Sequence, residues 1–290
     1  LSACGAGQSN GSESKNYEIA MVAKGFSQSF WVSVHQGADD AAAKYGATVT
    51  FNGPDNDSQV DKQADMVQNA INKSPDAVAI APLDEAALTP AVQSAKSASI
   101  PLFAFDTAFE TNADAITSTV KTSNREVGKV AAENLIALLN GKGKYAVIAH
   151  SQTDATSTER RDGFLDYMKK NAPDMEMVGE VQYSNADQAK AQDIASAILQ
   201  ANPDLDAIFA TNEATVVGAA TPVESALKSG HKVLLVGVDS GKAQQQYIRD
   251  GVISGSVSQN PYQIGYKTIE NAVKSLNGEK IDKVIDSGCF

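Results

Sequence analysis

Short apolar runs alternate with amphipathic stretches along nearly the whole chain, and this alternation limits the folds that the chain can adopt. Strands that are apolar on both faces and alternate with helices are typical of parallel sheets covered on both sides. One doubly wound sheet does not comfortably hold so many strands. We therefore predict an α/β protein with two Rossmann-like lobes, each a parallel sheet flanked by helices. The expected strands cover residues 18–23, 48–51, 77–80, 101–105, 145–149, 177–181, 207–210, 233–238 and 253–258, and the clearest helices of the second half cover 158–170, 187–200, 214–228 and 243–250.

Two local signals mark helix ends in the first half of the chain. Gly46 stands where the first helix is expected to end, and glycine adopts the left-handed conformation of a helix C-terminus without steric cost. Ser58 is a candidate N-cap for the next helix. The preceding Asp55-Asn56-Asp57 resembles the start of a calcium loop but lacks the glycine and terminal glutamate of an EF-hand. We interpret it as a helix-capping turn.

The composition excludes several classes of function. The 290 residues include 24 Lys and Arg against 35 Asp and Glu, a formal net charge of −11, so the chain is a poor partner for nucleic acids or anionic lipid headgroups. Two cysteines near opposite ends and three scattered histidines form neither a disulfide framework nor a zinc motif. No nucleophile and base stand at a recognisable spacing. We expect no metal, no cofactor and no catalysis.

The first sixteen residues differ in composition from the rest. Residues 6–16 are mostly Gly, Ser, Asn and Gln, which is typical of a flexible tether. Leu1-Ser2-Ala3-Cys4 followed by Gly5 resembles the lipobox of bacterial lipoproteins, and a buried or incidental cysteine is the alternative. The resemblance implies that the numbering begins inside a signal peptide, that Cys4 carries a lipid, and that the lobes lie outside the cytoplasmic membrane.

Polar residues follow several of the predicted strands. Open parallel sheets bind ligands beyond the carboxyl ends of their strands, so we expect these residues to converge in one crevice. Three of them, Asp106, Asn212 and Asp239, stand equally well where a helix N-cap is expected. The candidates are Lys24, Gln28, Asp106, Asn212, Asp239 and Gln259.

Six blocks of sequence, in their order and spacing, resemble the sugar-binding proteins of ABC transporters in the ribose/galactose class, which have the type I periplasmic-binding-protein fold. The likeness runs from Tyr17 to about Asp282. The blocks are Lys24-Gly25-Phe26-Ser27-Gln28-Ser29-Phe30-Trp31, Phe105-Asp106-Thr107, Arg160-Arg161-Asp162-Gly163-Phe164, Phe209-Ala210-Thr211-Asn212-Glu213, Val236-Gly237-Val238-Asp239-Ser240 and Gln259-Asn260-Pro261-Tyr262-Gln263-Ile264-Gly265.

The resemblance implies a role for each matching position, and the chemistry suits a sugar. A sugar ring offers an apolar C–H face to an aromatic plane and a rim of hydroxyls to carboxylates, amides and a guanidinium. A core role for the aromatic residues and a surface ion pair for the arginine are the structural alternatives. By position, the stacking residues are Phe30 and Trp31, the carboxylates Asp106 and Asp239, the arginine Arg160, with Arg161 as its surface neighbour, and the amides Asn212 and Gln259.

Departures from the ribose pattern predict a different ligand. Lys24 replaces a small polar residue, Ala81 an asparagine, and Ala186 and Val238 aromatic residues. Fewer aromatic walls and an added cation favour a hexose, or alternatively a furanosyl signal or another polyol. His150 and the nearby Asp154 belong either to a surface loop or to the ligand site, and we favour the loop.

The resemblance also implies a division of the chain and a partner. Residues 17–121 and 260–282 would form the N-terminal lobe, and residues 122–259 and 283–290 the C-terminal lobe, with a multi-strand hinge whose crossings lie near 121, 259 and 282. We expect a monomer that closes on a monosaccharide and delivers it to a membrane permease, with sensing as an alternative to transport. A transcriptional regulator of related fold would need a DNA-binding helix-turn-helix, whereas this chain opens with a polar tether.

Overall fold

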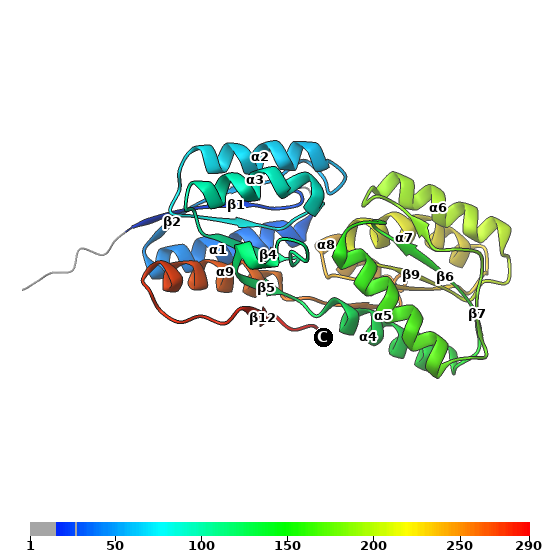
Figure 1. Cartoon of the computed structure of the whole chain (residues 1–290). Helices are drawn as coiled ribbons and strands as arrows, with labels where there is room; N and C mark the ends of the chain where they lie inside the picture. The colour runs from blue at the N-terminus through cyan, green and yellow to red at the C-terminus, as the bar shows by residue number, and fades with distance from the viewer. Residues whose placement is uncertain (1–15, 27) are drawn as a thin grey trace, which may run out of the picture.

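The two predicted lobes lie side by side, each with its own sheet (Figure 1). The computed structural model describes residues 16–26 and 28–290, so the lipid attachment expected at Cys4 and the tether lie outside the described residues. In both lobes all the strand pairs are parallel. The predicted fold class is confirmed.

The sheet of the first lobe has six strands in the part of the chain that is described. Its order places the first strand of the chain between the second and the third, which creates a switch point where ligands bind in open α/β sheets. The strands run in the order β12 (Val284–Asp286), β5 (Ile116–Lys121), β4 (Leu102–Asp106), β3 (Ala77–Ile80), β1 (Tyr17–Val22) and β2 (Ala47–Asn52).

The second lobe repeats this order. Its first strand again lies between the second and the third, so it has a corresponding switch point. The strand expected over 177–181 is instead two short pieces that both pair with the lobe's first strand. The order is β11 (Gly255–Val257), β10 (Leu234–Val238), β9 (Ala207–Ala210), β6 (Gly143–Ala149) and β7 (Met175–Met177), with β8 (Gln182–Tyr183) also on β6.

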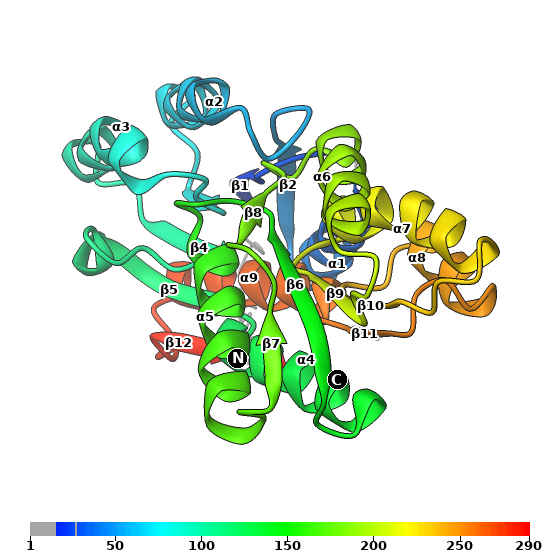
Figure 2. The same cartoon turned by 90° about the vertical axis from the view of Figure 1, so that its right-hand side faces the viewer.

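Helices cover both faces of each sheet, as Figure 2 shows for the second lobe. In the first lobe one face holds α1 (Ser29–Tyr45) and α9 (Pro261–Leu276), and the other α2 (Val60–Asn72) and α3 (Glu85–Ser97), with the short η1 (Ala113–Ala115) before β5. In the second lobe one face holds α4 (Asn124–Leu139) and α5 (Ala155–Asn171), and the other α6 (Gln188–Ala201), α7 (Glu213–Lys228) and α8 (Lys242–Arg249).

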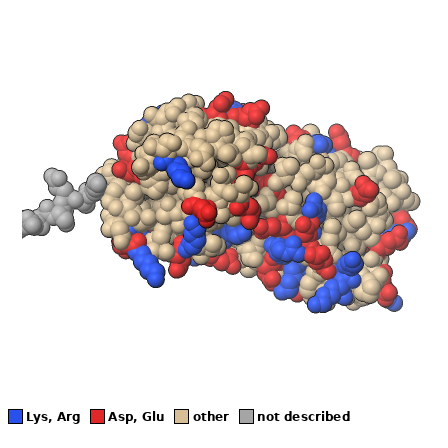
Figure 3. Space-filling view, viewed as in Figure 1, with Lys and Arg blue, Asp and Glu red and all other residues tan. Residues whose placement is uncertain are grey.

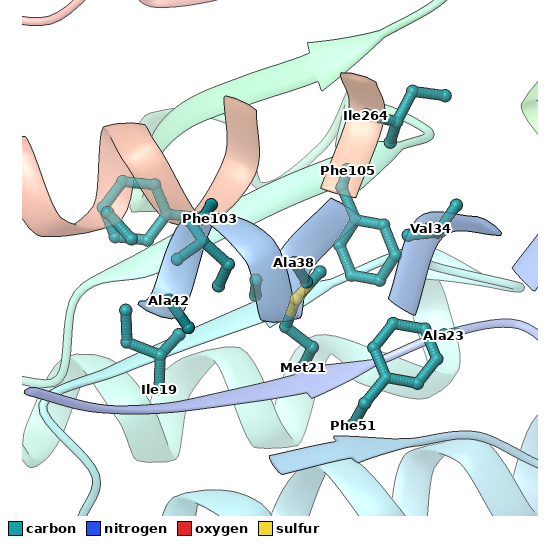
Figure 4. Close-up of a cluster of buried hydrophobic side chains, with 14 of the residues drawn as sticks. Ile19, Met21, Ala23, Val34, Ala38, Ala42, Phe51, Phe103, Phe105 and Ile264 are labelled. Atoms are coloured by element: carbon teal, nitrogen blue, oxygen red, sulfur yellow. The ribbon is translucent and has the colours of Figure 1, made fainter. Parts of the chain in front are cut away.

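The core of the first lobe shows why its strands are apolar on both faces. Alternate residues of β1 point to opposite sides, so Ile19 and Met21 pack beneath α1 while Ala20 and Val22 pack beneath α2 and α3. Figure 4 shows the α1 side, where Phe103 and Phe105 from β4 meet the residues of α1. Because both faces are buried, the strands read as continuous apolar runs rather than as alternating ones.

One helix-end prediction is confirmed and two are wrong. Gly46 ends α1 with a φ of 73°, in the left-handed region. Ser58 does not cap α2, whose N-cap residue is Gln59 and has no capping side chain. Instead Ser58 donates to Asn56 within a tight turn, so the Asp55-Asn56-Asp57 segment forms a turn but caps no helix.

Two strands were missed, and one of them changes the predicted division of the chain. Three consecutive hydroxyl residues occupy the middle of β5, and β12 has only three residues, so both lack the apolar runs by which the other strands were recognised. Because β12 pairs with β5, these residues extend the first sheet, whereas 283–290 had been assigned to the second lobe. The pairing places the third crossing after Asp286 rather than near 282. The crossings expected near 121 and 259 remain predictions.

The crossing segments are joined by hydrogen bonds. Ser287 N–H donates to the Lys121 carbonyl over 2.9 Å, and the Thr122 and Ser287 hydroxyls lie 3.0 Å apart. Ser258 and Phe290 exchange backbone hydrogen bonds. Beside them lies the half-buried Cys289, which was expected in the core or at an edge near the final strand. It packs against the core of the second lobe. The crossings therefore form one narrow connection.

The charge on the surface and the character of the helices are relevant to binding of nucleic acids and membranes. On the face in Figure 3, basic side chains lie among acidic ones and form no continuous basic patch. Among the helices of residues 16–26 and 28–290, none combines the length and apolar character needed to span a bilayer.

Candidate functional site

One cavity between the lobes brings together all nine residues expected to bind ligand. It lies beyond the carboxyl ends of both sheets. Three further residues line it: Asp57 and Thr156, which the sequence did not indicate, and His150, which we had placed in a surface loop. The nine are Lys24, Gln28, Phe30, Trp31, Asp106, Arg160, Asn212, Asp239 and Gln259.

Lys24 joins the two walls of the cavity. It follows β1, its side chain is 3% exposed, and its Nζ lies 3.0 Å from Asp106 Oδ2 in the same lobe. The same ammonium donates across the cleft to Asp154 Oδ2 over 2.5 Å. Burial opposes the charge of this group, but Asp106 and Asp154 raise the pKa of Lys24 above its ordinary value. The cation is thus shared by two buried carboxylates.

Asp154 is a buried residue with two roles, not part of a surface loop. As the N-cap of α5, its Oδ1 accepts from the Thr156 N–H over 2.7 Å and from the Thr156 hydroxyl over 2.5 Å. Its other oxygen faces Lys24. Burial raises the pKa of Asp154, but the Lys24 ammonium and the other neighbours lower it below its ordinary value, so the carboxylate stays charged.

His150 lies beside Asp154 as a neutral, fully bonded side chain. Burial lowers the pKa of His150 to about 3. The Thr156 hydroxyl proton goes to Asp154, so His150 Nε2, 3.1 Å away, donates to that oxygen. Nδ1 then accepts from the Thr211 hydroxyl over 2.7 Å. The two threonines determine the tautomer and the orientation of the ring.

Arg160 and Asn212 are held from behind by the second lobe. Arg160 Nε donates to Asn124 Oδ1 over 2.9 Å and Nη1 to the Thr211 carbonyl over 2.8 Å. Asn212 is the N-cap of α7 and accepts from Thr215 N–H over 2.9 Å, so its cap role and its place in the cavity coexist. By contrast Arg161 lies away from the cavity, on Asp162 and Tyr183.

The carboxylates expected at the strand ends have a backbone conformation in common. Asp106 has a φ of 63° and Asp239 a φ of 81°, both in the left-handed region that is rare outside glycine and concentrated at functional sites. Neither caps the helix that follows it, since the N-cap of η1 is Asn112 and the N-cap of α8 is Gly241. The N-cap alternative is therefore wrong for both.

Asp239 and Gln259 form a buried pair in the second wall. Gln259 Nε2 donates to Asp239 Oδ1 over 2.6 Å, and the other carboxylate oxygen accepts from the Glu213 N–H over 2.9 Å. Burial raises the pKa of Asp239, with Arg160 acting in the opposite sense. Both residues of the pair line the cavity together with Arg160.

An aromatic wall comes from the start of α1. Phe30 and Trp31 meet edge to face at 4.9 Å, and Trp31 meets Phe105 at 6.3 Å. Both residues belong to the core of the first lobe and also line the cavity, so their core position is compatible with the expected ligand contact. Gln28, the N-cap residue of α1, is buried next to them without a capping side-chain hydrogen bond.

Glu213 closes the gap beside this wall. It begins α7 in the second lobe and accepts from the N–H groups of Ser29 and Phe30 in the first lobe, over 3.3 and 3.2 Å. Free N–H groups at a helix N-terminus favour a negative partner. Burial and the neighbouring Asp239 raise the pKa of Glu213. The contact joins the lobes without involving a ligand.

A metal site has no support in the described part of the chain. No group of three His, Cys, Asp or Glu side chains within residues 16–26 and 28–290 is placed to hold an ion. The charged groups of the cavity are instead arranged as carboxylates around Lys24 and Arg160.

Comparison with known proteins identifies the family. Residues 19–280 match the model of the periplasmic binding protein domain, and the chain belongs to this family. It is 30% identical over 274 residues, 92% of this chain and 86% of the relative, to the D-allose-binding periplasmic protein of Escherichia coli, and 29% identical over 280 residues, 96% and 88%, to the ribose import binding protein of Bacillus subtilis. An ABC transporter solute binding protein from Agrobacterium vitis with bound D-fucose superposes with a TM-score of 0.89 at 35% identity, covering 94% of each chain.

Proposed function

We propose that this member of the periplasmic-binding-protein family captures a monosaccharide in the cleft between its lobes for import by an ABC transporter. The observation that carries the proposal is the convergence of two aromatic rings, carboxylates, amides and a guanidinium on one cavity at the carboxyl ends of both sheets. The relatives named above bind allose, ribose and fucose. A sugar is the ligand class that uses an apolar plane and a polar rim together.

The roles of the nine residues follow from their placement. Phe30 and Trp31 would pack on the C–H face of the ring, while Asp106 and Asp239 accept from hydroxyls. Arg160 donates through a fork that can span two neighbouring oxygens. Each charge-assisted hydrogen bond is worth about 1.5–3 kcal/mol, so losing one weakens binding roughly tenfold to a hundredfold.

Closure of the lobes is the expected response to the ligand. The narrow connection around Lys121, Ser258 and Ser287 can act as a hinge. Lys24 and Glu213 supply contacts that exist only when the lobes are together. A ligand that contacts both walls binds the closed form better than the open form and shifts the population toward it.

Lys24 supports a ligand other than ribose. Its ammonium lies between Asp106 and Asp154 and adds a donor to the cleft. We favour a hexose, and a furanosyl signal or another polyol is the alternative. Replacing Lys24 by methionine tests its role, since unchanged affinity for the bound sugar would exclude a ligand contact.

Three further features belong to the proposal. The protein binds its sugar without altering it, so the sugar recovered from the complex is chemically unchanged. It acts as a monomer that presents its closed form to a membrane permease. Cys4 carries a lipid that tethers the lobes to the outer face of the membrane, so Cys4→Ala should move the protein from the membrane fraction to the soluble fraction.

A ligand screen tests the function directly. Melting temperatures are recorded with pentoses, hexoses, polyols and furanosyl signals, because a ligand that binds only the native state stabilises it in proportion to concentration and affinity. One sugar that raises the melting temperature at micromolar concentration supports the proposal, and isothermal titration then gives its affinity. If no saccharide or polyol acts at millimolar concentration, import of a monosaccharide is excluded.

A further inference from the structure

The loop between β2 and α2 contributes a cleft residue that neither the sequence pattern nor the family resemblance indicated. Asp55 and Asn56 of this loop are used locally, in an ion pair with Lys62 and in a turn with Ser58. Asp57 instead lines the cavity between the lobes. One loop thus places one carboxylate at the surface and another against the ligand space.

Two polar atoms of the first wall lack hydrogen-bond partners. Among the described residues, the buried side-chain atoms without a partner are Trp31 Nε1, Asp57 Oδ1 and Asn271 Nδ2. The first two belong to residues that line the same cavity, whereas Asn271 lies on α9 outside it. A buried donor or acceptor without a partner costs free energy, so such atoms at a cavity point to a missing ligand group.

We propose that Trp31 Nε1 and Asp57 Oδ1 form a subsite for one hydroxyl group of the sugar and thereby select which epimer or deoxy form is bound. The proposal rests on the proposed function, because it requires a sugar in the cleft. The indole N–H donates to the hydroxyl oxygen, and the hydroxyl proton goes to the carboxylate.

A hydroxyl is the group that satisfies both atoms. It accepts one hydrogen bond and donates another, which matches a neighbouring donor and acceptor. An ammonium group could donate to Asp57 but could not accept from Trp31. A methyl group or a ring hydrogen would leave both atoms unpaired, and sites built to bind a hydroxyl discriminate strongly against ligands that lack it.

The surroundings hold Asp57 in place and set its charge. An ideal Cβ at Gly25 would lie 2.5 Å from Asp57 Oδ1, so the absence of a side chain there leaves room for the carboxylate. Burial raises the pKa of Asp57 to about 7, Lys24 lowers it, and Asp154 and Asp106 raise it further. The indole N–H lies near enough to Asp57 to favour its charged form, but no hydrogen bond of ordinary geometry joins them, so a hydroxyl can bridge the two groups.

The test combines three variants with a series of sugars. Asp57→Ala removes the acceptor, Trp31→Phe removes the N–H but keeps an aromatic ring, and Asp55→Ala is a matched control in the same loop. Affinities for D-allose, D-fucose, D-galactose and D-ribose are measured by isothermal titration, followed by the monodeoxy analogues of the tightest binder. Melting temperatures confirm that each variant is folded.

We expect Asp57→Ala and Trp31→Phe each to weaken binding about tenfold to a hundredfold, with no change for Asp55→Ala. One deoxy analogue lacks the contacted hydroxyl, and both variants should bind that analogue with the wild-type affinity to within about twofold. Once the hydroxyl is absent, removing its protein partner costs no further affinity, so the two effects are not additive. Unchanged affinity in either variant, or an equal loss with every analogue, would overturn the subsite and leave the proposed function intact. If none of these four sugars binds, the sugar found by the ligand screen takes their place. The proposed function fails, and the subsite with it, only if the wild type binds no saccharide or polyol in that screen.

Discussion

The two walls of the cleft differ in how their polar side chains are held. In the second lobe, His150, Asp154, Arg160, Asn212 and Asp239 all have hydrogen-bond partners within their own lobe. In the first lobe, Asp57 and Trp31 leave atoms unpartnered, and Lys24 reaches across to the other lobe. The second wall therefore keeps its geometry when the lobes separate, whereas the first wall needs the ligand and the opposite lobe to complete it.

This difference predicts which substitutions affect folding and which affect only binding. Removing a group from the second wall breaks hydrogen bonds that exist without ligand, so both the free energy of unfolding and the affinity should fall. At neutral pH, removing an unpartnered group from the first wall should reduce affinity without lowering the free energy of unfolding. The predictions below test this comparison in order of decreasing effect.

Asp154→Ala should have the largest effect. It leaves the buried Lys24 with only Asp106 as a counter-charge and removes the N-cap of α5. Loss of one partner of a buried ion pair costs about 3–5 kcal/mol of the free energy of unfolding, which urea denaturation measures. Asp166→Ala on the same helix, which breaks an exposed pair with Arg125, should cost no more than about 1 kcal/mol. Similar losses in both variants would contradict the buried network.

His150 should make the protein less stable as the pH falls. Its pKa drops from 6.5 to about 3 on folding, so the unfolded chain takes up a proton that the folded protein refuses. This contribution is present above pH 6.5 and is lost toward pH 3, at about 1.4 kcal/mol per pH unit. Urea denaturation at several pH values should show this slope in the wild type relative to His150→Gln. Parallel profiles would mean that His150 titrates normally.

Asp57 should make the protein more stable as the pH falls, the opposite of His150. Its effect on the free energy of unfolding should be weaker, because Asp57 is less completely buried than His150. Its pKa rises from 3.8 to about 7 on folding, so its contribution to stability is present below pH 3.8 and is lost as the pH rises toward 7. Relative to Asp57→Asn, the wild type should gain stability as the pH is lowered across this range. The same denaturation series measures it, and a gain of the wild type toward high pH would contradict the assignment.

Glu213→Ala should have the smallest effect. It removes the acceptor for the Ser29 and Phe30 N–H groups across the cleft, contacts that only the closed form makes. Each is worth about 0.5–1.5 kcal/mol, so sugar affinity should fall roughly twofold to tenfold. Small-angle scattering of the sugar-free protein should show a more open population. Glu224→Ala, an exposed residue of the same helix, is the control, and an equal change there would exclude a role for the interlobe contact.

The fold class could be predicted from the sequence for physical reasons, and so could the convergence of several of the nine expected ligand-binding residues. Strands buried on both faces must be apolar throughout, so β1, β3, β4, β9 and β10 were visible as continuous runs. Residues at the carboxyl ends of such strands lie at one edge of a parallel sheet, which placed Lys24 near Asp106 in the first lobe and Asp239 at the corresponding edge of the second sheet.

The tertiary structure alone decided the remaining features. The short β12 has little apolar signal of its own and is a strand because β5 offers it an edge, which moved the lobe boundary. His150 and Asp154 belong to the cleft because β6 ends at the switch point of the second sheet, and nothing in their local sequence distinguishes them from a surface loop. Asp55 and Asp57 are two residues apart and chemically identical. Asp55 pairs with Lys62 at the surface, whereas Asp57 packs against Gly25 and lines the cavity, because the loop turns between them.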